Sequence, residues 1–286
     1  MSNIVLRHSC HRGEIEISYL EWKPIENHTD SESLLLLHGL ADSATVWSSL
    51  GACLSHKYHI VAPDLRGHGE SSKSDSGYSS TEIIADLETL IAHLGWERSH
   101  ILGHSWGGKV AAIWATQNPE RFSSLILVDP FYIGKLPSWL NITFPVLYRV
   151  LPFLQGMGPF ENEIVAEELA KNLKQYRQWT PLQQQVFRDS IEPKSDGTWG
   201  SKFTIAARNQ IFTDVMQQAG LTKPLAIPSL FIQPTEGLNR TQWQLKPYRR
   251  YLSNLEIKQV PGNHWAFLVN PEKFNREVAE FLKRQI

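Results

Sequence analysis

The chain has 286 residues, of which 42% are hydrophobic, and its basic and acidic residues nearly balance at a formal charge of −1. A chain of this length and composition can bury a large core, either as one domain with an insertion or as two domains. The balanced charge, with no basic run, argues against a nucleic acid partner.

The N-terminal stretch, M-S-N-I-V-L-R-H-S-C-H-R-G, contains no apolar run long enough for a signal peptide. The chain has two cysteines, Cys10 and Cys53, which are too few for a disulfide framework and are expected to be inert thiols in a reducing compartment. These features predict a cytoplasmic protein. They leave its oligomeric state open, a homodimer included.

Strand and helix patterns alternate along the chain. Apolar or alternating runs predict strands at Val5–His8, Glu14–Trp22, Leu34–Leu37, His59–Ala62, the stretch before Ser105, Leu125–Val128, Ser229–Ile232 and Glu256–Val260. Apolar residues at helical spacing predict helices around Thr45–Leu54, Tyr78–Leu94, Lys109–Gln117 and Glu272–Arg284. The pattern predicts an α/β protein whose mostly parallel, eight-stranded sheet has helices on both faces and reactive loops at the carboxyl ends of its strands.

Residues 131–228 break this alternation and are mostly helical in their apolar spacing. The segment begins with large apolar residues: Phe131, Tyr132, Trp139, Leu140, Phe144, Leu147, Tyr148, Leu151, Phe153, Leu154, Met157 and Phe160. Arg149 and three prolines interrupt this stretch, which argues against a transmembrane helix. We interpret the segment as a helical cap inserted into a core of residues 1–130 and 229–286. Its apolar residues are expected to form the cap's own core, to line a substrate pocket, or both.

The sequence G-H-S-W-G-G at residues 103–108 lies between a predicted buried strand and an alanine-rich helix. Ser105 is therefore expected on a tight strand-to-helix turn, where Gly103 and Gly107 have no room for a Cβ. Gly108 would allow the helix to pack close to the sheet. A G-x-S-x-G pattern between a strand and a helix is typical of a nucleophile elbow.

Four motifs, in this order and spacing, resemble the cap-bearing branch of the α/β-hydrolase superfamily: L-L-L-L-H-G-L-A-D-S-A-T-V-W, V-A-P-D-L-R-G-H-G-E-S, G-H-S-W-G-G and V-P-G-N-H-W. The elbow is similar to the H-D-W-G elbow of haloalkane dehalogenases and epoxide hydrolases, with serine in place of aspartate. Those enzymes form an alkyl-enzyme ester through a carboxylate, whereas a serine alcohol is suited to acyl transfer.

A serine nucleophile needs a neighbouring base, and His264 is the best candidate among the eleven histidines. It follows the last predicted strand and comes late in the chain, as the order serine, acid, histidine requires. The backbone N–H groups of Trp106, directly after the nucleophile, and of Leu40, after His38 and Gly39, are expected to form the oxyanion hole.

The acid of the triad has two candidates. In most members of the resembled superfamily it follows the seventh strand in a stretch similar to G-x-x-D, whereas this chain reads S-L-F-I-Q-P-T-E-G-L-N-R. Pro234 stands where the glycine is usual, Gly237 where the aspartate is usual, and Glu236 lies one residue early. The other position used in the superfamily, at the end of the sixth strand, holds Asp129. We favour Asp129, with Glu236 as the alternative.

These residues predict a serine hydrolase that cleaves a carboxylic ester or thioester with an apolar group through an acyl-enzyme. Cleavage of a carbon–carbon bond and acyl transfer to another acceptor are alternatives on the same triad. A non-catalytic small-molecule receptor or binding protein on the same fold is the alternative from another class. No metal-binding spacing and no complete dinucleotide motif occurs in the sequence, so we expect neither a metal nor a cofactor.

Overall fold

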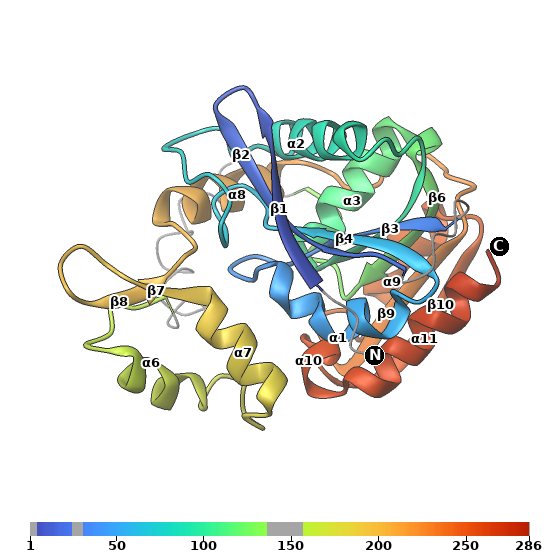
Figure 1. Ribbon diagram of the computed structural model, residues 1–286. Coiled ribbons are helices and arrows are strands. Elements are labelled where there is room, and N and C mark those ends of the chain that lie inside the picture. Colours follow the sequence, from blue (N-terminus) through green and yellow to red (C-terminus); the bar gives the residue numbers. More distant parts are fainter. Residues whose placement is uncertain (1–4, 25–30, 136–156, 286) are drawn as a thin grey trace.

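The computed structural model describes residues 5–24, 31–135 and 157–285, and its centre is an eight-stranded sheet (Figure 1). The strands are β1 (Val5–Arg12), β2 (Ile15–Trp22), β3 (Glu32–Leu37), β4 (Tyr58–Pro63), β5 (Ser99–His104), β6 (Phe122–Val128), β9 (Ser229–Glu236) and β10 (Leu255–Asn263). Their order across the sheet is β1-β2-β4-β3-β5-β6-β9-β10. The β1–β2 and β2–β4 pairs are antiparallel, and the remaining pairs are parallel. The predicted fold class is confirmed.

Helices cover both faces of this sheet (Figure 1). The core on one face includes residues of α2 (Ser80–His93), α3 (Ser105–Gln117), α8 (Ile205–Gln217) and α9 (Gln242–Tyr251). The core on the other face includes residues of η1 (Ala44–Trp47), α1 (Ser48–Leu54), α10 (Ala266–Val269) and α11 (Pro271–Lys283). The central strands are buried on both sides, as their continuous apolar runs predict.

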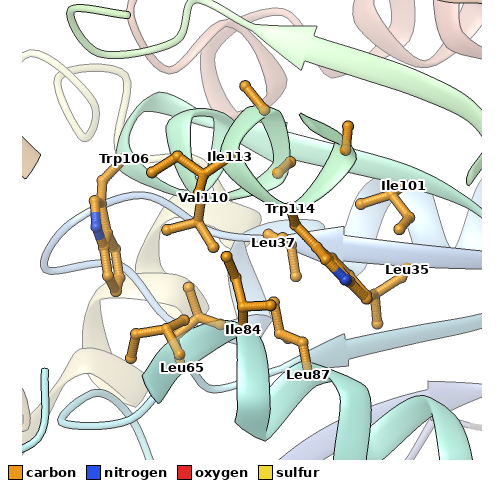
Figure 2. Packing of buried hydrophobic residues seen from close by; sticks show 14 of the residues in the cluster. Leu35, Leu37, Leu65, Ile84, Leu87, Ile101, Trp106, Val110, Ile113 and Trp114 are labelled. Carbon is orange, nitrogen blue, oxygen red and sulfur yellow. The ribbon is translucent and has the colours of Figure 1, made fainter. Parts of the chain in front are cut away.

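Helix α3, which begins at Ser105, packs against strands β5 and β6 of the sheet and against α2. Figure 2 shows Val110, Ile113 and Trp114 of α3 directed towards Ile84 and Leu87 of α2. Trp114 is fully buried, and its indole N–H donates to Glu88 Oε1 at 2.6 Å. This packing fixes the position of α3, and with it the position of the serine at its first residue.

The segment between β6 and β9 contains α6 (Glu163–Ala170), α7 (Pro181–Ser190) and α8, together with a small antiparallel sheet of β7 (Ile191–Pro193) and β8 (Trp199–Ser201). The helical periodicity predicted the helices but not this hairpin. Each hairpin strand is only three residues long, which is too short for the alternating pattern that marks a strand. Among the described helices, none is both long and apolar enough to cross a membrane.

Candidate active site

Ser105 lies at the turn between β5 and α3 with a backbone φ of 51°, in the left-handed region that only glycine adopts freely. A Cβ on Gly103 would approach the carbonyl oxygen of Gly107 to 2.5 Å, and a Cβ on Gly107 would approach the carbonyl oxygen of His38 to 2.3 Å. A Cβ on Gly108 would meet the Gly103 carbonyl oxygen at 2.8 Å. The three glycines therefore allow the tight turn that the sequence predicts.

His264 and Asp129 are brought together from the ends of two different strands. His264 follows β10, Asp129 follows β6, and His264 Nδ1 lies 2.6 Å from Asp129 Oδ2. Asp129 is fully buried, and His264 lines the same cavity as Ser105. An acceptor at this distance from Nδ1 holds the imidazole with its proton on Nδ1, which leaves Nε2 free to accept one.

The Asp129 carboxylate is surrounded by hydrogen-bond donors from the loop after β9. It accepts the backbone N–H of Leu238 at 2.7 Å and that of Asn239 at 3.0 Å, and the Asn239 side-chain amide also donates to it at 3.0 Å. Burial alone would raise the pKa of Asp129, but His264 and the two backbone donors outweigh it and lower that pKa below its usual value. Asp129 therefore stays ionised beside His264.

Gly237 explains how a carboxylate from β6 reaches the loop after β9. A Cβ on Gly237 would lie 2.5 Å from Asp129 Oδ2, so any side chain at this position would clash with the carboxylate. The carboxylate of Asp129 therefore occupies the space that a side chain at position 237 would need. This is the position where most members of the resembled superfamily have an aspartate. Glu236, the alternative acid, is the exposed last residue of β9 and contributes no hydrogen bond to His264 in the described part of the chain.

Leu40 and Trp106, whose backbone N–H groups are the predicted oxyanion donors, both lie at the cavity that contains Ser105. Leu40, Ser105, Trp106 and His264 all line one cavity. Trp106 is the second residue of α3, and the N–H groups in the first turn of a helix have no partner within the helix. The Trp106 ring is buried against His68, with ring centroids 5.3 Å apart, so the side chain anchors the start of α3.

A second buried aspartate links the predicted oxyanion loop to the loop of the base. Asp42 accepts the indole N–H of Trp265 at 3.3 Å and lies 3.5 Å from Nδ1 of His104. His104 Nε2 in turn donates to the carbonyl oxygen of His264 at 3.0 Å. Burial and the neighbouring His264 lower the pKa of His104. These contacts fix the His264 main chain relative to the nucleophile turn.

The cavity has a volume of about 630 Å³. Its apolar lining includes Phe131, which the sequence predicts, and Ile211, Phe212 and Val215 of α8, which it does not single out. The helical spacing of these three α8 residues is the signal that could have indicated them. Three basic residues, Lys174, Arg177 and Arg240, also line the cavity and were not predicted.

The other apolar residues predicted for the cap have varied positions. Phe160 is buried in the core on the α11 face of the sheet, Met157 packs against the core on the α3 face, and Tyr132 is 44% exposed. Trp139, Leu140, Phe144, Leu147, Tyr148, Leu151, Phe153 and Leu154 lie outside the described residues. Within the described ranges, no group of three or more His, Cys, Asp or Glu residues is arranged to hold a metal ion.

Comparisons with known proteins match both the sequence and the architecture. A family model described as alpha/beta hydrolase fold matches residues 32–271. An uncharacterized protein of Mycobacterium tuberculosis is 38% identical over 267 residues, which are 87% of this chain and 75% of that protein. A soluble epoxide hydrolase of Corynebacterium sp. is 35% identical over 145 residues, half of each chain. The crystal structure of E-2-(acetamidomethylene)succinate hydrolase matches with a TM-score of 0.80 at 20% identity, over 98% of this chain and 100% of that one.

Proposed function

The chain belongs to the alpha/beta hydrolase fold family, and from that premise we propose that it is a serine hydrolase of carboxylic esters or thioesters. The observation that carries the proposal is the His264–Asp129 hydrogen bond of 2.6 Å, in the same cavity as a serine on a tight elbow. A buried, ionised aspartate on Nδ1 orients the imidazole and stabilises it when it becomes charged. The hydrolases among the relatives support a hydrolytic reaction.

The proposed reaction begins when Ser105 Oγ attacks the carbonyl carbon of the ester and His264 Nε2 accepts the hydroxyl proton. The backbone N–H groups of Leu40 and Trp106 stabilise the negative charge that forms on the carbonyl oxygen. The carbon–oxygen or carbon–sulfur bond then breaks, and His264 donates its proton to the leaving group. Water next attacks the acyl-enzyme, its proton passes through His264 to Ser105, and the carboxylic acid is released.

The nucleophile separates this proposal from epoxide or carbon–halogen chemistry. Opening an epoxide or displacing a halide through an ester intermediate uses a carboxylate at the elbow, and this chain has an alcohol there. An alcohol activated by a histidine is suited to attack on a carbonyl carbon. The apolar lining from Phe131 and α8 supports a substrate with an apolar group, and we propose that residues 131–228 act as the cap that provides this lining.

The proposal is tested by hydrolysis of p-nitrophenyl esters from acetate to octanoate. We expect kcat/KM to rise from acetate to medium chains, because each buried CH₂ contributes about 0.8 kcal/mol, roughly fourfold. Ser105→Ala should lower turnover by about 10⁴-fold or more, since the members of a triad act as a unit. Ser76→Ala, an exposed serine in the loop after β4, is the matched control and should keep wild-type turnover.

Two outcomes would contradict the proposal. Hydrolysis by Ser105→Ala at the wild-type rate would remove Ser105 from the reaction. Binding of these esters by the folded wild-type protein without any turnover would favour a receptor or binding protein. A preference for acetate over every longer chain would leave the serine chemistry intact but would refute the apolar substrate.

A further inference from the structure

The exposed charged residues that line the cavity containing Ser105 are mostly of one sign. Lys174, Arg177 and Arg240 line it, and all three are exposed. In the described part of the chain, no carboxylate lies within ion-pair distance of any of their side chains. Glu236 is the one exposed carboxylate in this lining. Asp42 also lines the cavity, but it is buried and accepts the indole N–H of Trp265. The exposed charges of the lining are therefore mainly positive, although the whole chain has a formal charge of −1.

Each of these three basic residues lies at or next to an anchored part of the chain. The carbonyl oxygen of Lys174 accepts the side-chain amide of Asn263 at 2.9 Å. Arg177 follows Tyr176, which is 5% exposed and packs against Phe187. Arg240 follows Asn239, whose side chain is bound to Asp129. The chain is thus held in place next to each basic residue, and the three side chains are exposed.

Part of the apolar lining comes from a separate element, α8. Ile211, Phe212 and Val215 belong to α8, which is bound beside α2 and the loop after β4: Thr204 donates to the Gly67 carbonyl oxygen, and the backbone N–H of Ser80 donates to Asp214 at 2.9 Å. These lining residues are tied to α3 and to the chain after β6, because Lys109 donates to the carbonyl oxygens of Gly134 and Val215 and the Phe131 and Phe212 ring centroids are 6.2 Å apart. They form an apolar group that is separate in the chain from the three basic residues.

The position of His264 indicates which half of an ester lies near the basic residues. The protonated base gives its proton to the leaving group, so the leaving group must lie on the His264 side of the scissile bond. Asn263, which holds Lys174, directly precedes His264. The basic residues thus lie on the leaving-group side of the scissile bond.

We infer that the substrate is an ester or thioester of an apolar acyl group with an alcohol or thiol that carries a carboxylate or phosphate. Lys174, Arg177 and Arg240 bind this anion and select the leaving group, while α8 and Phe131 receive the acyl chain. This inference rests on the proposed serine hydrolase function and adds the chemical class of the substrate.

The test compares two hexanoate esters that differ only in a carboxylate on the leaving group, 2-nitrophenyl hexanoate and 3-hexanoyloxy-4-nitrobenzoate. The measured quantity is the ratio of kcat/KM for the anionic ester to that for the neutral ester. Replacing Lys174, Arg177 and Arg240 together by Gln should lower this ratio by about tenfold, since each exposed charge contributes roughly two- to threefold. Added salt should lower the wild-type ratio towards that of the variant.

Matched variants make the result specific. Lys223→Gln removes an exposed lysine that does not line the cavity and should leave the ratio unchanged, whereas Glu236→Gln removes the opposing charge and should raise it. The ratio of kcat/KM for 1-hexanoylglycerol 3-phosphate to that for 1-hexanoylglycerol gives the preference for a phosphate. The site binds the anion, carboxylate or phosphate, whose ratio falls more in the triple variant. Arg240→Gln alone changes a single exposed residue and should lower the same ratio by roughly two- to threefold.

An equal ratio in the wild-type protein and the triple variant, for both anions, would overturn the inference. If Ser105-dependent hydrolysis of the neutral ester persists in that case, the proposed function stands and only the anionic leaving group is rejected. If the neutral ester is hydrolysed at the same rate without Ser105, the proposed function itself fails.

Discussion

Ser105 and Asp129 both have a left-handed backbone, with φ values of 51° and 40°. A residue other than glycine in this region costs about 1–2 kcal/mol and persists only where its surroundings fix it. At Ser105 the surroundings are the three glycines of the elbow, and at Asp129 they are the donors from Leu238 and Asn239. In both cases the strained main chain aims a functional side chain towards His264 or the cavity.

The choice between Asp129 and Glu236 as the acid is open to a direct test. Asp129→Asn should lower kcat on a neutral ester by about 10²–10⁴-fold, because the amide no longer stabilises the charged imidazole or selects its tautomer. Glu236→Gln should change kcat on that ester less than about twofold, since Glu236 lies exposed at the end of β9. Steady-state kinetics with thermal melts of both variants measures the effect. The reverse order of the two effects would make Glu236 the acid.

The sequence alone shows a glycine, Gly237, at the position where an aspartate is usual, and an aspartate, Asp129, after the sixth strand. It does not show that these two residues lie close together. The complementary fit, with a Cβ on Gly237 only 2.5 Å from the Asp129 carboxylate, depends on how the loops after β6 and β9 meet in space. Such a contact between residues far apart in the chain cannot be read from local pattern.

At the scale of elements, α3 is joined to α8 by a buried lysine. Lys109 is fully buried, and its ammonium donates to the carbonyl oxygen of Gly134 at 2.8 Å and to that of Val215. Burial lowers the pKa of Lys109 to about 7. Because Val215 lines the cavity, this link couples the helix that starts at Ser105 to the apolar lining from α8.

Lys109 should make stability depend on pH in the alkaline range. Between about pH 7 and its unfolded pKa, the unfolded chain holds a proton on Lys109 that the folded chain has lost, so the free energy of unfolding rises with pH. The contribution between pH 7 and pH 10 reaches at most about 4 kcal/mol. Urea unfolding at both pH values measures it, and Lys109→Met should lack this rise. Lys223→Met, at an exposed lysine, is the control, and equal pH dependence in all three proteins would refute the shifted pKa.

Elements were predictable where they are long and regularly patterned. All eight strands of the main sheet were predicted, and α2 (Ser80–His93) and α11 (Pro271–Lys283) agree with the predicted helices to within about two residues. Helices α9 and α10 were not predicted. Proline 247 lies within α9, and α10 is only four residues long, so neither gives a strong periodic signal.

For the whole molecule, the alternation of strands and helices was enough to predict the fold, because a parallel sheet covered on both faces leaves a distinct apolar pattern. The residues that line the cavity were harder to predict. Its walls combine the ends of several strands with the segment between β6 and β9, and the packing of that segment determines which side chains face Ser105. The division into a core and a cap therefore stays a prediction, as does the cytoplasmic location.

Whether Ser105 is an activated nucleophile is measured by the intact mass of the protein after reaction with a fluorophosphonate, followed by peptide mapping. We predict one covalent adduct, on Ser105, because a serine activated by His264 attacks phosphorus as it attacks a carbonyl carbon. Ser105→Ala should take up no adduct, and Asp129→Asn should react more slowly than the wild-type protein. A folded wild-type protein that forms no adduct, or an adduct that maps to another residue and persists in Ser105→Ala, would contradict the account.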